Sequence, residues 1–161
     1  MYATKENNQE PQFAAFLAID WADRKHVWSL QSADSQKRER GEVEHTPEAI
    51  EAWVAQIHQR FGQRPIAVAV EQSRGALVFM LSKYESLHIF PVPPAMSANF
   101  RKAFYPSGSK DDPKDTDLLL DMLQKHRDKL RRRTRRRPGA SRTWWRSGAS
   151  WWTRKPPRAT V

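Results

Sequence analysis

Two nearly continuous apolar runs lie in the first half of the chain, and each ends at an acidic residue. Residues 13–19 lead to Asp20, and residues 65–70 lead to Glu71. Apolar runs of this length, without polar alternation, are typical of strands buried on both faces of a sheet. The pattern therefore predicts two central strands that each carry a carboxylate at the carboxyl end.

Shorter patterns predict three further strands. Residues 26–30 alternate between polar and apolar positions, which favours a strand antiparallel to the first one. The polar segment 37–44 fits an exposed edge strand, and residues 88–92 fit a short strand that is closed by prolines.

Between and after these strands, apolar residues recur at helical spacing. Thr46 and Pro47 form a helix start, a hydroxyl cap followed by proline at the first helical position, and Gly62 is a suitable end. Three more helices are predicted over residues 75–84, 97–104 and 112–130. The apolar stripes that support the first and last helices consist of Ile50, Trp53, Val54, Ile57 and Phe61, and of Leu118, Leu119, Met122 and Leu123. This order of elements predicts one layered α/β domain over residues 13–130, preceded by a disordered N-terminus at 1–12.

Charge is divided very unevenly between this domain and the end of the chain. Residues 1–130 hold 17 Lys/Arg and 18 Asp/Glu, whereas residues 131–161 hold 11 Lys/Arg and no acid. The net charge of +10 is therefore not evidence that the domain binds nucleic acid. The chain has no cysteine and no apolar stretch long enough to cross a membrane, so we expect a cytoplasmic protein with no membrane contact.

The acidic residues offer the clearest chemistry. Asp112 and Asp115 are three residues apart at a predicted helix start and so share one helical face. If that face meets the strand ends that carry Asp20 and Glu71, four carboxylates converge. Oxygen ligands of this kind suit a hard divalent cation, and two such cations can stabilise the attacking and leaving oxygens of a phosphodiester. For each acid taken alone, a helix-dipole or loop role is the competing interpretation.

These residues resemble a known pattern. Ala18-Ile-Asp20, Ala69-Val-Glu71 and the Lys-x-Asp-x-x-Asp signature at Lys110–Asp115 are similar to the DEDD tetrad of the IS110 insertion-sequence transposases. The resemblance covers about residues 13–130. It assigns Asp20, Glu71, Asp112 and Asp115 as catalytic and metal-binding residues. Asp111 is an alternative third ligand, although the spacing to Asp115 favours Asp112.

The resemblance implies an RNase H-like (RuvC-like) fold, a mixed sheet flanked by helices, with Mg²⁺ or Mn²⁺ at the tetrad. It further implies that the protein binds, cuts and joins DNA at element ends, guided by a structured RNA and assembled as a homo-oligomer. Complete family members carry a second, C-terminal domain with a serine nucleophile. We expect that this chain is truncated, lacks that domain and has little transposition activity alone.

The tail at 131–161 has two competing interpretations. Its arginines and tryptophans could form a nucleic-acid-binding arm. Alternatively, because tryptophan has the single codon TGG, a one-base shift in reading converts residues 143–146 to Leu-Val-Glu and residues 150–155 to Lys-Leu-Val-Asp-Glu-Lys. Since this is an amphipathic helix of the kind with which the family continues, we favour a frameshift after Leu130 and a disordered tail.

Three basic residues are candidates for nucleic-acid contacts. Lys110 precedes the paired acids and could reach a scissile phosphate, and Arg101 and Lys102 could bind the backbone, but a solvated surface role is equally compatible with the sequence. Two other functions stay open: a stand-alone RuvC-like nuclease that uses the same acids, and a nucleic-acid-binding protein that acts through its basic tail.

Overall fold

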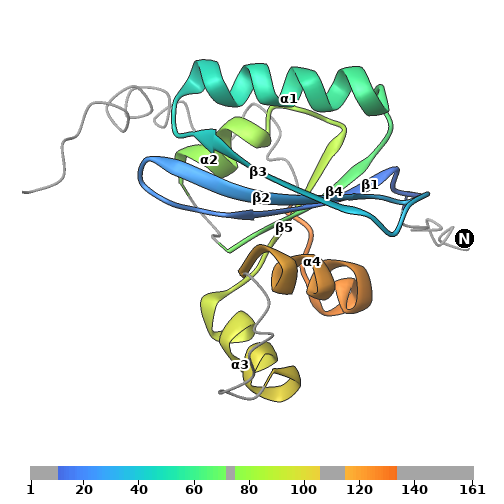
Figure 1. The fold of residues 1–161 in the computed structure, drawn as a ribbon, viewed down its shortest axis with the longest axis vertical. Helices are drawn as coiled ribbons and strands as arrows, with labels where there is room; N and C mark the ends of the chain where they lie inside the picture. The colour runs from blue at the N-terminus through green and yellow to red at the C-terminus, as the bar shows by residue number, and fades with distance from the viewer. Residues whose placement is uncertain (1–10, 72–74, 106–114, 134–161) are drawn as a thin grey trace, which may run out of the picture.

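The sheet is built on the two apolar runs, which form neighbouring parallel strands at its centre (Figure 1). The computed structural model describes residues 11–71, 75–105 and 115–133. Its five strands lie in the order β3-β2-β1-β4-β5. Their bounds are Ala15–Asp20 for β1, Lys25–Ser32 for β2, Arg38–Glu44 for β3, Ile66–Val70 for β4 and Leu87–Pro91 for β5.

The strand directions make this a mixed sheet. β2 is antiparallel to both β1 and β3, whereas β4 is parallel to β1 and β5 is parallel to β4. All five predicted strands are present, and the polar segment is an edge strand as expected. Together with helices on both faces, this confirms the predicted α/β fold class, a mixed sheet flanked by helices as in RNase H-like domains.

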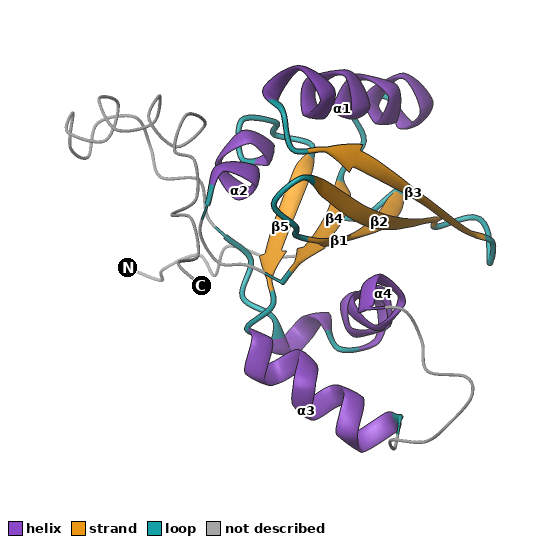
Figure 2. Ribbon diagram, turned by 60° about the vertical axis from the view of Figure 1, so that its left-hand side comes forward, coloured by secondary structure: helices purple, strands orange, loops and turns teal. Residues whose placement is uncertain are grey.

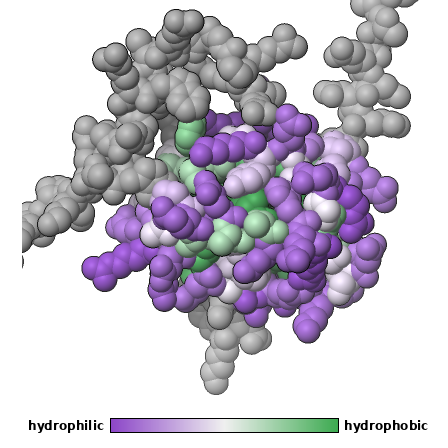
Figure 3. Space-filling view, turned by 90° about the horizontal axis from the view of Figure 1, so that it is seen from above, coloured by the Kyte–Doolittle hydropathy of each residue, from purple (hydrophilic) through white to green (hydrophobic). Residues whose placement is uncertain are grey.

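Two helices cover one face of the sheet (Figure 2). α1 runs from Pro47 to Phe61 and α2 from Ala76 to Leu81. α1 starts as predicted, because the Thr46 hydroxyl accepts a hydrogen bond from the Ala49 amide, and Gly62 follows with a φ of 65°. The apolar side of α1 packs on β-strand residues in the larger core. The face of the molecule seen from above is mostly hydrophilic, with some apolar side chains exposed near its centre (Figure 3).

The opposite face carries α4, Asp115–Lys125, while α3, Pro94–Phe104, extends away from the sheet beside it. The predicted stripe of α4 is buried against small residues of β1 and β4, Ala18, Ala67 and Ala69. The prediction of one continuous helix over 112–130 was wrong beyond Lys125. After Lys125 no apolar residue occurs before Leu130, so no face remains to be buried, and a short 3₁₀ turn, η1 (Arg127–Lys129), follows instead.

The described chain continues three residues past the predicted domain boundary. Leu130 is buried in the same apolar cluster as Phe13, and the Arg133 amide donates a hydrogen bond to the Ile89 carbonyl of β5 (2.8 Å). The predictions of a disordered N-terminus and of a frameshifted tail concern mainly residues 1–10 and 134–161. These residues lie outside the described part of the chain. Within the described part of the chain, none of the helices has the length and apolarity needed to cross a bilayer.

Candidate active site

The register of the two parallel strands brings Asp20 and Glu71 side by side. Ile19 pairs with Val70, and each is followed by an acid, Asp20 at the end of β1 and Glu71 directly after β4. Side chains alternate along a strand, and each acid lies two positions after an alanine, Ala18 or Ala69, that belongs to the cluster under α4. Asp20 and Glu71 therefore lie on the same face of the sheet, at the edge formed by the carboxyl ends of β1 and β4, and both are half-buried.

Asp115 is brought to this edge as the first residue of α4. Its carboxylate is largely exposed and forms an ion pair with the Arg101 guanidinium of α3. Glu71 is also held from α3, because the Ser97 hydroxyl lies 2.5 Å from its Oε1 atom and 2.9 Å from the Pro94 carbonyl. Each of these two acids thus has one partner on the same neighbouring helix.

The three carboxylates interact electrostatically. The pKa of Asp20 is raised, first by burial and then by the negative charges of Asp115 and Glu71. Burial and like charges both disfavour the ionised form of a carboxyl group. A cation at this edge would relieve the repulsion, although within residues 11–71, 75–105 and 115–133 no three acidic or histidine side chains form a ready-made metal-binding group.

A cleft of about 320 Å³ opens beside these acids, between α3 and α4. Glu71 and Asp115 line it together with Arg101 and Lys102, so it combines acidic and basic walls. Its remaining lining residues are Pro94, Ser97, Ala98, Leu118 and Leu119. A cleft with this mixture can accommodate a phosphodiester next to carboxylates that could hold a cation.

The sequence-predicted residues are thus distributed between the described and undescribed parts of the chain. Asp20, Glu71 and Asp115 gather at one edge of the sheet, and Arg101 and Lys102 lie on the adjoining cleft wall. Asp112, its alternative Asp111, and Lys110 lie outside the described residues. Arg101 is engaged by Asp115 rather than free in solvent.

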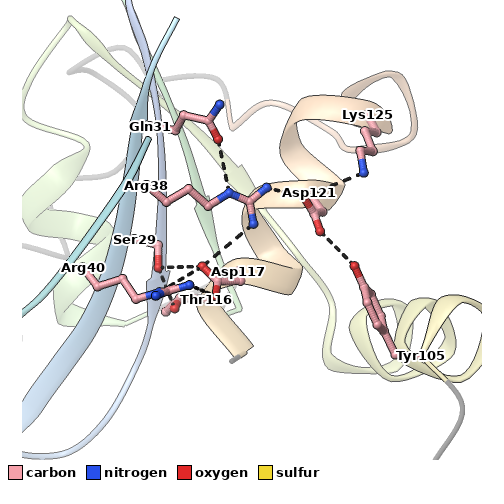
Figure 4. Close-up of polar contacts among 9 residues, drawn as sticks. All are labelled: Ser29, Gln31, Arg38, Arg40, Tyr105, Thr116, Asp117, Asp121 and Lys125. Carbon is pink, nitrogen blue, oxygen red and sulfur yellow. Dashed lines mark hydrogen bonds and ion pairs between the residues drawn. The ribbon is translucent and has the colours of Figure 1, made fainter. Parts of the chain in front are cut away.

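Sequence reasoning missed Ser97 and two further acids. Ser97 is buried at the start of α3, and a small polar residue in the first turn of a proline-initiated helix was the available signal. Asp117 and Asp121 are buried on α4 and bonded to the edge strand β3 (Figure 4). The two acids are four residues apart, and the arginines that bind them, Arg38 and Arg40, are two apart on a polar strand. This matched spacing was the available signal.

Comparison with known families gives one match. A family model for DEDD transposases of the IS110 type, described as a transposase, matches residues 17–140. Comparison with curated proteins gave no match.

Proposed function

The chain belongs to the IS110 family of DEDD transposases, and we propose that its acidic edge is the metal-dependent site that cuts and joins DNA at insertion-sequence ends. Membership of this family supports a role in DNA transposition in general. The observation that carries the finer proposal is the register of β1 and β4, which gives Asp20 and Glu71 equivalent positions on adjacent parallel strands.

The donor set fits a hard divalent cation. Asp20, Glu71 and Asp115 offer only carboxylate oxygens, the ligand type that Mg²⁺ and Mn²⁺ prefer, and the raised pKa of Asp20, caused first by burial and then by its acidic neighbours, indicates mutual repulsion that a cation would offset. We propose Asp112 as the fourth ligand. Bound Mg²⁺ or Mn²⁺ would supply charge stabilisation for the attacking and leaving oxygens of the phosphodiester.

The protein's own side chains prepare the site for that cation and for DNA. Ser97 orients the Glu71 carboxylate, and Arg101 holds Asp115 at the mouth of the cleft. Lys102 is exposed on the same wall, where, with Arg101 and Lys110, it would contact backbone phosphates. A structured guide RNA and a homo-oligomeric assembly belong to the same proposal.

Isothermal titration with Mn²⁺ tests the metal site. We expect Asp20→Asn and Glu71→Gln each to weaken binding by at least about 10-fold, because each removes an anionic ligand while conserving volume. Asp128→Asn, which removes an acid from η1, away from the cleft, is the matched control and should bind as the native chain does. Unchanged affinity in both site variants would refute the assignment.

DNA binding is tested by deleting residues 134–161, the part of the tail beyond the described chain. If the cleft is the binding surface, the shortened chain should retain most of its affinity for double-stranded DNA, and Lys102→Ala should reduce it further. Complete loss of binding on deletion would instead show that the basic tail carries the interaction.

A further inference from the structure

α4 carries two carboxylates that are nearly removed from solvent. Asp117 is 5 % exposed and Asp121 is 6 % exposed, although both lie on a helix at the surface of a small domain. Four residues apart, they share one side of α4. That side faces β2 and β3, away from the cleft in which Asp115 lies.

Asp117 is bound to the edge strand β3 and to its neighbour β2. The Arg40 guanidinium donates from Nη2 to Asp117 Oδ2 (2.5 Å) and from Nε to Oδ1 (3.3 Å). The Ser29 hydroxyl of β2 lies 3.3 Å from the same Oδ1 and 2.8 Å from the Thr116 hydroxyl. Ser29 and Arg40 are directly opposed partners in the β2–β3 ladder, so they form one platform under the helix.

Asp121 connects three elements. Its Oδ1 accepts from Arg38 Nη2 on β3 (2.5 Å), and its Oδ2 accepts from the Tyr105 hydroxyl at the end of α3 (3.0 Å). Arg38 is itself oriented by a bond from its Nε to the Gln31 side chain (3.2 Å), and Lys125 lies 3.9 Å from Asp121 (Figure 4). The single carboxylate of Asp121 therefore joins α4 to the end of α3 and to the edge strand β3.

Such a network is not required merely to bury α4. The apolar side of the helix already packs on the sheet, and an apolar contact there would avoid the desolvation cost of two carboxylates. However, the positions of β1 and β4 in this cluster are small, Ala18, Ala67 and Ala69, and only its other members, such as Phe13 and Phe90, are large. Small side chains on two neighbouring strands do little to stop a helix from sliding or rotating over them. Directed hydrogen bonds at two points on one side of a helix do specify its rotation and its position along the axis.

We propose that Asp117 and Asp121 are positioning residues which, through Arg40, Arg38 and Tyr105, fix α4 so that Asp115 faces Glu71 across the cleft. The inference rests on the proposed metal site, to which Asp115 contributes. None of these network residues needs to touch the metal or DNA. Their role is to hold the helix that presents a ligand, as outer-shell residues do around many metal centres.

The test compares Mn²⁺ affinity and thermal stability in the full chain. Asp117→Asn keeps the side-chain volume but removes the charge that holds Arg40, and we expect its Kd for Mn²⁺ to rise by about 10-fold. Tyr105→Phe removes one hydroxyl and leaves the apolar core intact, so it serves as a milder variant with a smaller rise in Kd. Val54→Ala, in the core on the opposite face of the sheet, is the control for loss of stability alone.

The comparison separates positioning from general stabilisation. Val54→Ala should lower the melting temperature while leaving the Kd for Mn²⁺ unchanged, whereas the two network variants should raise the Kd at temperatures where they are fully folded. Equal Kd values in Tyr105→Phe, Asp117→Asn and the native chain would overturn the inference while leaving the metal site intact. If the native chain binds no Mn²⁺, the proposed function fails and the inference fails with it.

Discussion

Gly41 should resist substitution because Trp28 occupies the space where its side chain would be. The two residues are directly opposed in the β2–β3 ladder. A Cβ atom at Gly41 would lie 2.4 Å from Trp28 Cζ2 and 2.7 Å from Cε2, closer than such atoms approach in proteins. The indole has little room to retreat, since its ring packs against Trp53 of α1 with 5.9 Å between centroids.

The expected cost follows from two opposing effects. Forcing a methyl group into a packed site costs about 1–3 kcal/mol, whereas replacing glycine in a strand interior by alanine recovers about 0.5–1 kcal/mol of conformational entropy. Gly41→Ala should therefore lower the free energy of unfolding by up to about 2.5 kcal/mol, with a central value of about 1 kcal/mol. In a domain of this size, the melting temperature should fall by roughly 4 °C for each kcal/mol.

A double-mutant cycle measured by urea unfolding isolates the cause. In a Trp28→Leu background the clashing ring is absent, so Gly41→Ala should be neutral or slightly stabilising. Gly62→Ala is the matched control: Gly62 has a φ of 65°, and a methyl group there would have no neighbouring atom within 4 Å, so its cost arises from the backbone and should not depend on Trp28. An equal cost of Gly41→Ala in both backgrounds would refute the steric argument.

Three further outcomes are expected. Lowering the pH from 7 to 5 should reduce the free energy of unfolding by about 2 kcal/mol more in the native chain than in His26→Asn, as measured by urea unfolding. The reason is that burial, followed by the charge of His45, lowers the pKa of His26 to about 4, so that below its ordinary pKa of 6.5 the unfolded chain takes up a proton that the folded chain does not. Thr46→Ala should cost about 1 kcal/mol by removing the cap of α1, with a fall in melting temperature. Lys102→Ala should weaken DNA binding equally across sequences and reduce the dependence of log K on log salt by about 1 in fluorescence titrations.

The sheet was predictable from the sequence because burial alone determines it. Apolar runs required β1 and β4 to be central, and polar character required β3 to be an edge. The extent of the last helix was not predictable from its apolar stripe, since residues 126–129 are polar and could have continued a solvated helix. In the structure the helix ends at Lys125, soon after its apolar stripe ends, and the next residue, His126, packs on α3, edge-on against Phe100 and tilted against Phe104.

The acids at the strand ends were predictable for the same reason, because a run of buried residues fixes where its last side chain must lie. The acids of α4 were not. Asp115 and Asp117 are both in the first turn and look equivalent in the sequence, yet one is exposed beside the cleft and the other is buried beneath Arg40. Only the rotation of the helix on the sheet distinguishes them, and that rotation depends on contacts between residues 77 positions apart.

The two faces of the sheet therefore differ in how they are specified. Large apolar side chains such as Ile50 and Leu81 fill the α1–α2 side, where burial is strong and any displacement would leave a cavity. On the α4 side the β1 and β4 positions in the cluster are alanines, larger residues such as Phe90 complete it, and the polar network adds directed restraint on the helix. The candidate site lies on this second side. The cleft there opens between α3 and α4, beside the carboxylates at the strand ends, and directed bonds hold the helix that faces them. A face packed like the first one would be more stable but would bury the acids on which the proposed chemistry depends.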